Sequence, residues 1–177
     1  MRPTPTTDMR KLQKIGLILL MGMVLHAPCG VFAENLIHQY SLPLSLAQRA
    51  ATAALNKCQE GNYRVSVAVV DQGGNLQVLL RMNNAGPHTI DSSSHKAYTA
   101  ASLRRSTTHL AELVSKKPSL ASLRDMNEKI LILGGGLPIK VNGEVVGGIG
   151  VGGAPGAHLD EACAQAGLTA IHANKVN

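Results

Sequence analysis

The sequence predicts an α+β fold, with an antiparallel sheet of about five strands and flanking helices that cover one face. Apolar periodicity gives the segment order helix, hairpin, helices, hairpin, helix. Two tight turns, at residues 71–75 and at Asn142-Gly143, each join two short apolar runs and so predict two hairpins. Hairpins pair neighbouring strands antiparallel, which favours α+β over a doubly wound parallel sheet.

The first predicted helix runs from Ser45 to just before Gly61. Ser45 and Gln48 have the spacing of a capping box. Apolar residues recur every four positions along one face of this helix: Leu46, Ala50, Ala54 and Cys58. Residues 65–70 (VSVAVV) then predict a buried strand, and residues 76–80 its hairpin partner across the turn DQGGN.

Two helices are predicted in the middle of the chain, over residues 89–103 and 108–115. Asp91 falls in the first turn of the longer helix, where the helix dipole favours an anion. The shorter helix stops before Pro118, because proline does not continue a helix. Residues 119–129 predict a loop or a helical turn.

Three strands and a last helix are predicted after residue 129. The strands cover residues 130–133, 139–141 and 144–151. Asn142-Gly143 supplies the positive φ angles that a two-residue hairpin turn requires. The last helix covers residues 158–173, and its apolar face holds Leu159, Cys163, Ala166 and Ala170.

Residues 1–33 have the pattern of a cleaved secretory signal peptide. Basic residues precede an uncharged aliphatic run at residues 15–25, which is short for a membrane span. Val31 and Ala33 fit the small residues before a cleavage site, so residues 34–177 form a single mature domain. We therefore expect a periplasmic or secreted protein with no stable membrane insertion after cleavage. A tethered protein is the weaker alternative.

Charge and aromatic content argue against nucleic-acid binding. Four of the 17 Lys and Arg residues and one of the 11 Asp and Glu residues lie before residue 34, so the remaining chain carries a formal charge of +3 rather than +6. That remaining chain has three Tyr and neither Trp nor Phe. Nucleic-acid binders combine a basic stripe with stacking aromatic residues, so we exclude this class.

Cys58 and Cys163 are separated by 105 positions. In an oxidising compartment they can form a disulfide. The alternative is that both are small buried hydrophobic residues. No CxxC or zinc-ligand pattern accompanies them.

Glycine is concentrated in one stretch, because ten of the 18 glycines lie in residues 134–156. Gly148, Gly150 and Gly153 match the G-x-G-x-x-G fingerprint of dinucleotide sites. That fingerprint needs a parallel strand that turns directly into a helix, whereas this strand belongs to a hairpin and a Pro-Gly segment follows it. We reject a nucleotide site. The glycines leave two readings open: close approach by a flat ligand or a second subunit, and bulges or bends in the sheet.

Three sequence blocks stand in a fixed order: SVAVVDQGGNL at residues 66–76, TIDSSSHKAYTAAS at 89–102 and GGGLPIKVNGEVVGGIGVGG at 134–153. Together they resemble the GlcG/HbpS family of small haem-associated proteins, which is also similar to the C-terminal domain of PduO. The resemblance covers residues 43–172. It implies a profilin-like antiparallel sheet, haem as the cofactor of exported members, and a homo-oligomer.

Haem needs an axial iron ligand, positive groups for its propionates and apolar surface for its ring. His88 is the first candidate for the iron ligand, because it lies in the loop before the central helix with Thr89 beside it. His95, two helical turns further on, and His109 are the other histidine candidates.

Lys96 and Arg81 are the candidate partners of the propionates. A structural ion pair is an equal alternative for Lys96. Tyr98 is a candidate ferric ligand, although a core position in mid-helix is favoured for it. The pair Arg104-Arg105 predicts a solvated face or a subunit contact.

The leading hypothesis is an exported haem-binding protein for haem storage, buffering or sensing. One alternative is an enzyme, or an enzyme-accessory protein, that acts on a small organic acid or a corrinoid. The other is a non-catalytic oligomeric assembly module. Neither H-E-x-x-H nor G-x-S-x-G occurs, which favours binding over catalysis, with haem or another small planar ligand as the partner.

Overall fold

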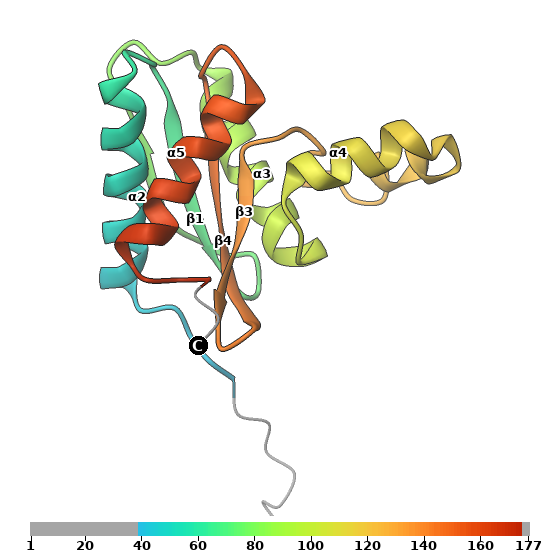
Figure 1. The fold of residues 1–177 in the computed structure, drawn as a ribbon, viewed down its shortest axis with the longest axis horizontal. Helices are drawn as coiled ribbons and strands as arrows, with labels where there is room; N and C mark the ends of the chain where they lie inside the picture. The colour runs from blue at the N-terminus through green and yellow to red at the C-terminus, as the bar shows by residue number, and fades with distance from the viewer. Residues whose placement is uncertain (1–38, 175–177) are drawn as a thin grey trace, which may run out of the picture. The chain divides into compact units, whose positions relative to one another are not determined.

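The computed structural model describes residues 39–174 (Figure 1). The predicted signal peptide, residues 1–33, lies outside the described residues. The elements, in chain order, are α2 (Leu44–Glu60), β1 (Ser66–Asp71), β2 (Leu76–Arg81), α3 (His88–Leu103), α4 (Thr107–Lys116), the 3-10 helix η1 (Pro118–Arg124), β3 (Gly136–Val141), β4 (Glu144–Gly152) and α5 (Ala157–Ala170). This order confirms the predicted sequence of helix, hairpin, helices, hairpin and helix.

The sheet has four strands in the order β2-β1-β4-β3, and every neighbouring pair is antiparallel. The prediction of about five strands was wrong at residues 130–133, which form no strand. The backbone N–H of Leu131 donates instead to Thr99 Oγ1 of α3, at 2.8 Å. A helix side chain therefore takes the hydrogen bond that a neighbouring strand would have supplied.

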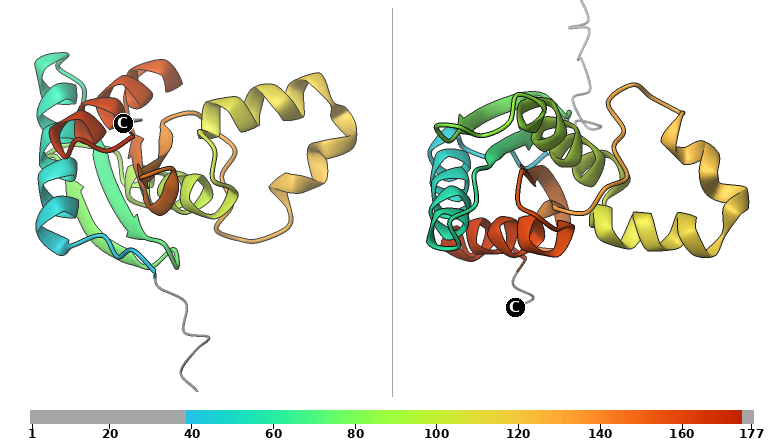
Figure 2. Two further views of the ribbon diagram at one scale, coloured as in Figure 1. Left: turned by 60° about the horizontal axis from the view of Figure 1, so that its bottom comes forward. Right: turned by 90° about the horizontal axis from the view of Figure 1, so that it is seen from above.

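Helices cover both faces of the sheet, so the prediction of one covered face was wrong. Figure 2 shows α2 and α5 on one side of the strands and α3 on the other. Val67 and Val69 of β1 join the core beneath α2 and α5. The alternate residues Ala68 and Val70 pack against α3. Continuous apolar runs such as VSVAVV are typical of strands that are buried on both faces.

The glycines of β4 explain how close α3 lies to the sheet. Gly148, Gly150 and Gly152 alternate along the strand and face α3. A Cβ atom at Gly148 would overlap the carbonyl oxygen of Ala97, and one at Gly150 would overlap that of Ser93. These glycines therefore admit the chain's own helix, rather than the flat ligand or second subunit that the sequence left open.

The Asn142-Gly143 turn is confirmed, with φ angles of 51° and 82°. The predicted capping box at Ser45 is wrong. Helix α2 begins at Leu44 after Pro43, and no side chain caps its N-terminus. Side-chain capping occurs instead at α4, where the Ser106 side chain accepts a hydrogen bond from the His109 N–H at 3.2 Å.

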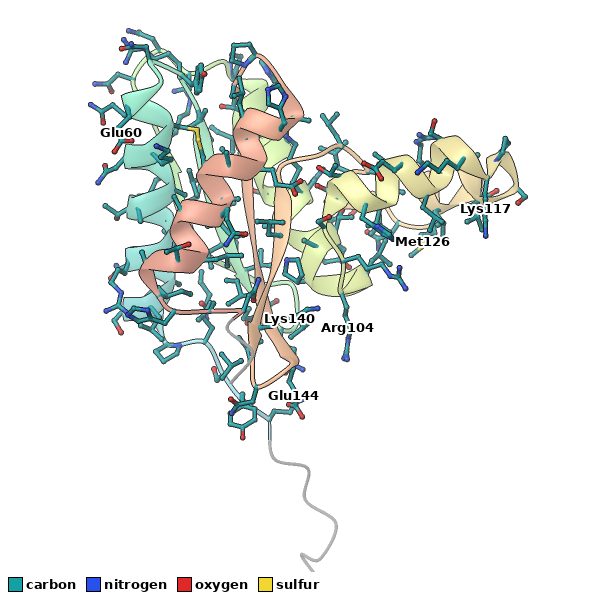
Figure 3. The ribbon with its side chains drawn as sticks, viewed as in Figure 1. Glu60, Arg104, Lys117, Met126, Lys140 and Glu144 are labelled. Atoms are coloured by element: carbon teal, nitrogen blue, oxygen red, sulfur yellow. A yellow bond between two sulfur atoms is a disulfide. The ribbon has the colours of Figure 1, made fainter. Side chains whose placement is uncertain are left out.

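Cys58 of α2 and Cys163 of α5 form a disulfide, with their Cα atoms 5.5 Å apart. Figure 3 shows it as the yellow bond between the two helices. Both residues are also buried in the core, so the bond crosslinks helices that already pack together. Of the two alternatives that the sequence left open, the structure therefore has the disulfide, and its cysteines are buried as well.

Helix α4 and η1 project away from the layered part of the fold, with Lys117 near the far end (Figure 3). Leu110 and Val114 of α4 are buried, whereas η1 has no buried residue. Within residues 39–174, no helix is both long and apolar enough to cross a membrane.

Candidate functional site

A cleft of about 310 Å³ lies where α3 and α5 begin. Its lining comes from α3, from the start of α5 and the segment that joins β4 to it, and from the segment before β3: His88, Ser92, Lys96, Leu133, Gly153, Ala154, Pro155, Gly156, Ala157 and Asp160. His88 is the first residue of α3, and Ala157 is the first residue of α5. The cleft is thus bounded by the N-terminal ends of two helices that are far apart in the sequence.

Neither helix N-terminus has a side-chain cap. Pro87 precedes α3 and Gly156 precedes α5, and neither residue offers a side-chain acceptor to the first turn. The N–H groups of a first turn have no partner within the helix, and the helix dipole adds partial positive charge there. The ends of α3 and α5 therefore favour an anionic group in the cleft.

A buried ion pair closes the inner end of the cleft. Lys96 Nζ of α3 lies 2.9 Å from Asp160 Oδ2 of α5, and both side chains are at most 5% exposed. Lys96 Nζ also donates to the Val151 carbonyl at 2.9 Å, and Asp160 Oδ1 accepts from the Ala154 N–H at 3.0 Å. These bonds fix α3, α5 and the end of β4 relative to one another.

Burial raises the pKa of the Asp160 carboxyl above its ordinary value, because removal from water disfavours the charged form. The Lys96 ammonium and the backbone N–H groups of Ala154 and Gly153 oppose this effect and offset part of it. Lys96 therefore forms a structural ion pair with Asp160, which is the alternative that the sequence left open for it.

His88 is exposed and its ring lies against Gly86. Thr89, beside it, is buried. Its Oγ1 donates to the Gly86 carbonyl at 2.7 Å and lies 2.7 Å from Ser66 Oγ of β1. Thr89 thus anchors the first turn of α3 to the sheet, and His88 is left free to face the cleft.

The other predicted residues lie away from the cleft. His95 is half-buried on α3 and is not part of the lining. Arg81 donates to the carbonyl of Ala85 within its own loop. His109 lines a different cavity. The ring of Tyr98 lies against Gly74, with Lys129 Nζ 5.7 Å from its centroid.

The structure therefore brings together His88 and Lys96 from the predicted set. Sequence reasoning missed the segment 153–157 and the partner carboxylate Asp160. One signal for the segment was present: AGPH before α3 and APGAH before α5 each place Gly and Pro ahead of a helix start without a capping residue. Within residues 39–174, no group of three or more His, Cys, Asp or Glu side chains could hold a metal ion.

Comparison with known proteins gives consistent matches. A family described as "Haem degrading protein HbpS-like" matches residues 42–169. The Escherichia coli K12 protein GlcG is 34% identical over 117 residues, which cover 62% of this chain and 80% of GlcG. The crystal structure of a double mutant of HbpS from Streptomyces reticuli is 40% identical, with a TM-score of 0.73 over 81% of this chain and 95% of HbpS.

A third match is the crystal structure of a PduOC–haem complex, which is 26% identical with a TM-score of 0.71. It covers 78% of this chain and all of PduOC, 100%. The TM-scores of HbpS and PduOC show that both share the α+β arrangement of this chain. The chain therefore belongs to the HbpS-like family.

Proposed function

We propose that this chain is an exported haem-binding protein and that it holds haem at the cleft between the N-termini of α3 and α5. The observation that carries the proposal is the position of His88, an exposed imidazole beside two uncapped helix N-termini. Imidazole is a common axial ligand of haem iron, and helix N-termini favour anions such as propionates. The related PduOC has been crystallised with haem.

The residues of the cleft fit this group in part. Its volume of about 310 Å³ lies at the small end of the roughly 300–1,000 Å³ typical of small-molecule sites. The cleft is thus suited to one edge of a porphyrin. We expect a second copy of the chain to cover the rest of the ring in a homo-oligomer.

Each group in the cleft has a distinct role in this proposal. His88 would hold the iron through an imidazole nitrogen, and the partial positive charge at the first turns of α3 and α5 would favour the propionates. Leu133, which is 48% exposed, and Pro155 supply apolar surface for the ring. Lys96 and Asp160 keep the two helix ends at a fixed separation, and neither binds haem directly.

Storage, buffering or sensing of haem outside the cytoplasm is the role that we propose. The Cys58–Cys163 disulfide supports export, because structural disulfides persist in oxidising compartments. The signal-peptide pattern of residues 1–33 supports the same location. A mass measurement on the periplasmic fraction should find a mature chain that begins at Glu34. A chain that keeps residues 1–33 in the cytoplasm would contradict export.

A hemin titration followed by absorbance tests the binding itself. The protein should develop a Soret band that saturates at a fixed ratio of hemin to chain. His88→Ala should shift the band and weaken binding at least tenfold, whereas His109→Ala, an exposed histidine in a different cavity, should leave both unchanged. A saturating band that is lost in His109→Ala but kept in His88→Ala would refute the assignment.

A further inference from the structure

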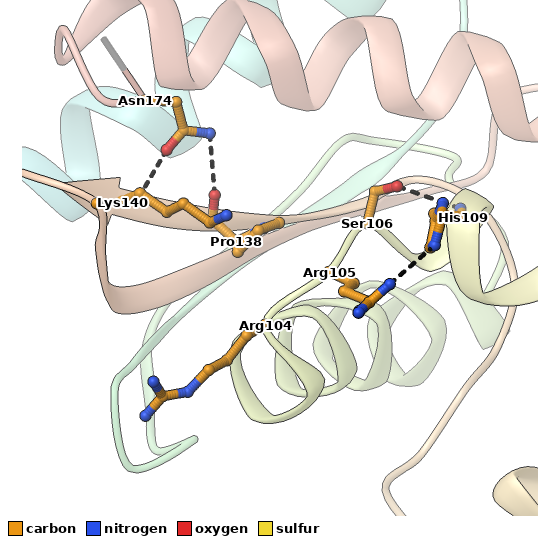
Figure 4. Close-up of a pocket in the computed structure, with 8 residues that line it drawn as sticks. Arg104, Arg105, Ser106, His109, Pro138, Lys140 and Asn174 are labelled. Atoms are coloured by element: carbon orange, nitrogen blue, oxygen red, sulfur yellow. Dashed lines mark hydrogen bonds between the residues drawn. The ribbon is translucent and has the colours of Figure 1, made fainter. Parts of the chain in front are cut away.

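A second cavity, of about 530 Å³, lies between the end of α3, the start of α4 and the β3–β4 hairpin (Figure 4). Its lining comes from three separate segments of the chain: Arg104, Arg105, Ser106, His109, Pro138, Lys140, Gly143 and Asn174. Helix α3 has 16 residues, so this cavity and the cleft at His88 are about 24 Å apart along the helix. The two sites are therefore separate.

The charged side chains that line this cavity are all positive. Arg104, Arg105 and Lys140 line it, and no Asp or Glu is among its lining residues. The salt bridges of residues 39–174 are Lys57–Glu60 and Lys96–Asp160, so none of the three cations is paired with a carboxylate there. Three unneutralised cations around one cavity attract an anion and raise its local concentration.

The floor of the cavity is already hydrogen-bonded. Asn174 Oδ1 accepts from the Lys140 N–H at 2.6 Å, and Asn174 Nδ2 donates to the Pro138 carbonyl at 3.1 Å (Figure 4). These bonds cover the outer edge of β3, which is an edge strand of the sheet. The backbone beneath the cavity is thus satisfied, and the cationic side chains remain available to a ligand.

The two arginines are presented differently. Arg105 Nη1 donates to His109 Nε2 at 3.1 Å, which orients that guanidinium toward the first turn of α4. Arg104 has a φ of 57°, a left-handed conformation, and its side chain extends away from Arg105 in Figure 4. The Arg105 guanidinium is therefore held beside the cavity, and the exposed Arg104 adds positive charge at its rim.

The lining also limits the kind of ligand. Pro138 is its only apolar residue apart from Gly143, and it contains no Phe, Tyr or Trp. A nucleobase or a porphyrin ring would have no stacking surface there. We propose that this cavity binds a small oxyanion with at least two negative charges, either a phosphate-bearing compound or a compound with two or more carboxylates.

Amide NMR spectroscopy with sodium phosphate and sodium succinate as probes tests this proposal, with sodium chloride at matched ionic strength as the reference. At least one probe should shift the Ser106, His109 and Lys140 amide signals in a saturable way. Saturation by phosphate identifies a phosphoryl ligand class, and saturation by succinate alone identifies a carboxylate class. No saturable shift with either probe would overturn the proposal.

Two variants locate the site. Arg104→Gln with Arg105→Gln should weaken binding of the probe at least tenfold, and Lys140→Gln should weaken it independently. Arg49→Gln removes one exposed cation from α2 and should leave binding unchanged. Equal binding by the double variant, or equal weakening by Arg49→Gln, would refute the site. Hemin binding should be unaffected in all of these variants, so failure here is distinguishable from failure of the haem proposal.

Discussion

Lys96 Nζ lies 2.9 Å from Asp160 Oδ2, and this buried contact joins the central helix α3 to the first turn of α5. The two residues are separated by 64 positions in the sequence. The contact fixes the two helix ends that bound the candidate haem cleft. The shape of the cleft therefore depends on a charge pair that does not itself face solvent.

Removal of one partner of this pair should be costly. Lys96→Met leaves the Asp160 carboxylate buried without its counter-charge, and we expect a loss of about 3–5 kcal/mol in the free energy of unfolding. Lys96→Met with Asp160→Leu should recover part of that loss, because no buried charge remains, although the Ala154 N–H loses its acceptor. Denaturant unfolding measures both values. A double variant less stable than Lys96→Met would contradict this account.

The same pair predicts a dependence of stability on pH. The pKa of Asp160 is raised in the folded protein above its ordinary value of 3.8, so the folded state binds this proton more tightly than the unfolded state does. This tighter proton binding stabilises the folded state. The stabilisation is complete below pH 3.8 and is lost as pH rises through the raised pKa of Asp160. The difference in unfolding free energy between the native chain and Asp160→Asn should fall across that window and then become constant. A difference that rises with pH would show that Lys96 outweighs the cost of burial.

The glycines of β4 predict a steric effect. Gly150→Ala places a methyl group against the carbonyl of Ser93 and the amide of Ala97, so α3 must move, at an expected cost of about 1–3 kcal/mol. Gly143→Asn is the matched control. A Cβ atom there meets nothing within 4 Å, and Asn adopts positive φ angles such as this 82° more readily than most residues. Thermal unfolding compares the two variants, and equal midpoints for both would refute the close-packing explanation.

The Cys58–Cys163 disulfide should raise the free energy of unfolding. Cys58→Ala with Cys163→Ala removes a crosslink between residues 105 positions apart, and we expect the free energy of unfolding to fall by about 2–4 kcal/mol. A reducing agent should lower the unfolding midpoint of the native chain and leave that of the double variant unchanged. If the native chain unfolds at the same midpoint with and without reductant, the bond does not form in solution.

Local sequence signals were sufficient for most of the fold. The Asn142-Gly143 turn and the apolar run at residues 65–70 depend on backbone geometry and periodicity within a few residues. The errors at residues 130–133 and at the second face of the sheet had non-local causes. Residues 130–133 have strand-like composition, but Thr99 takes the N–H of Leu131. The second covered face of the sheet depends on glycines that admit α3, and no local pattern distinguishes that use of glycine from a ligand site.

Local signals also predicted only part of the candidate site. His88 was identified from its place before a helix. The partner of Lys96 is 64 positions away, and spacing alone could not single out Asp160 among the carboxylates. Segment 153–157 enters the cleft because two helix starts meet at one end of the sheet, which is a property of the topology.

The most direct test of the central claim is an amide NMR map of the mature chain with zinc protoporphyrin, a diamagnetic analogue of haem. If the cleft is the haem site, the signals of Ser92, Gly153 and Ala157 should shift or broaden in a saturable manner, and those of Ser106 and Lys140 should not. Saturable changes that leave Ser92, Gly153 and Ala157 unaffected would contradict the account.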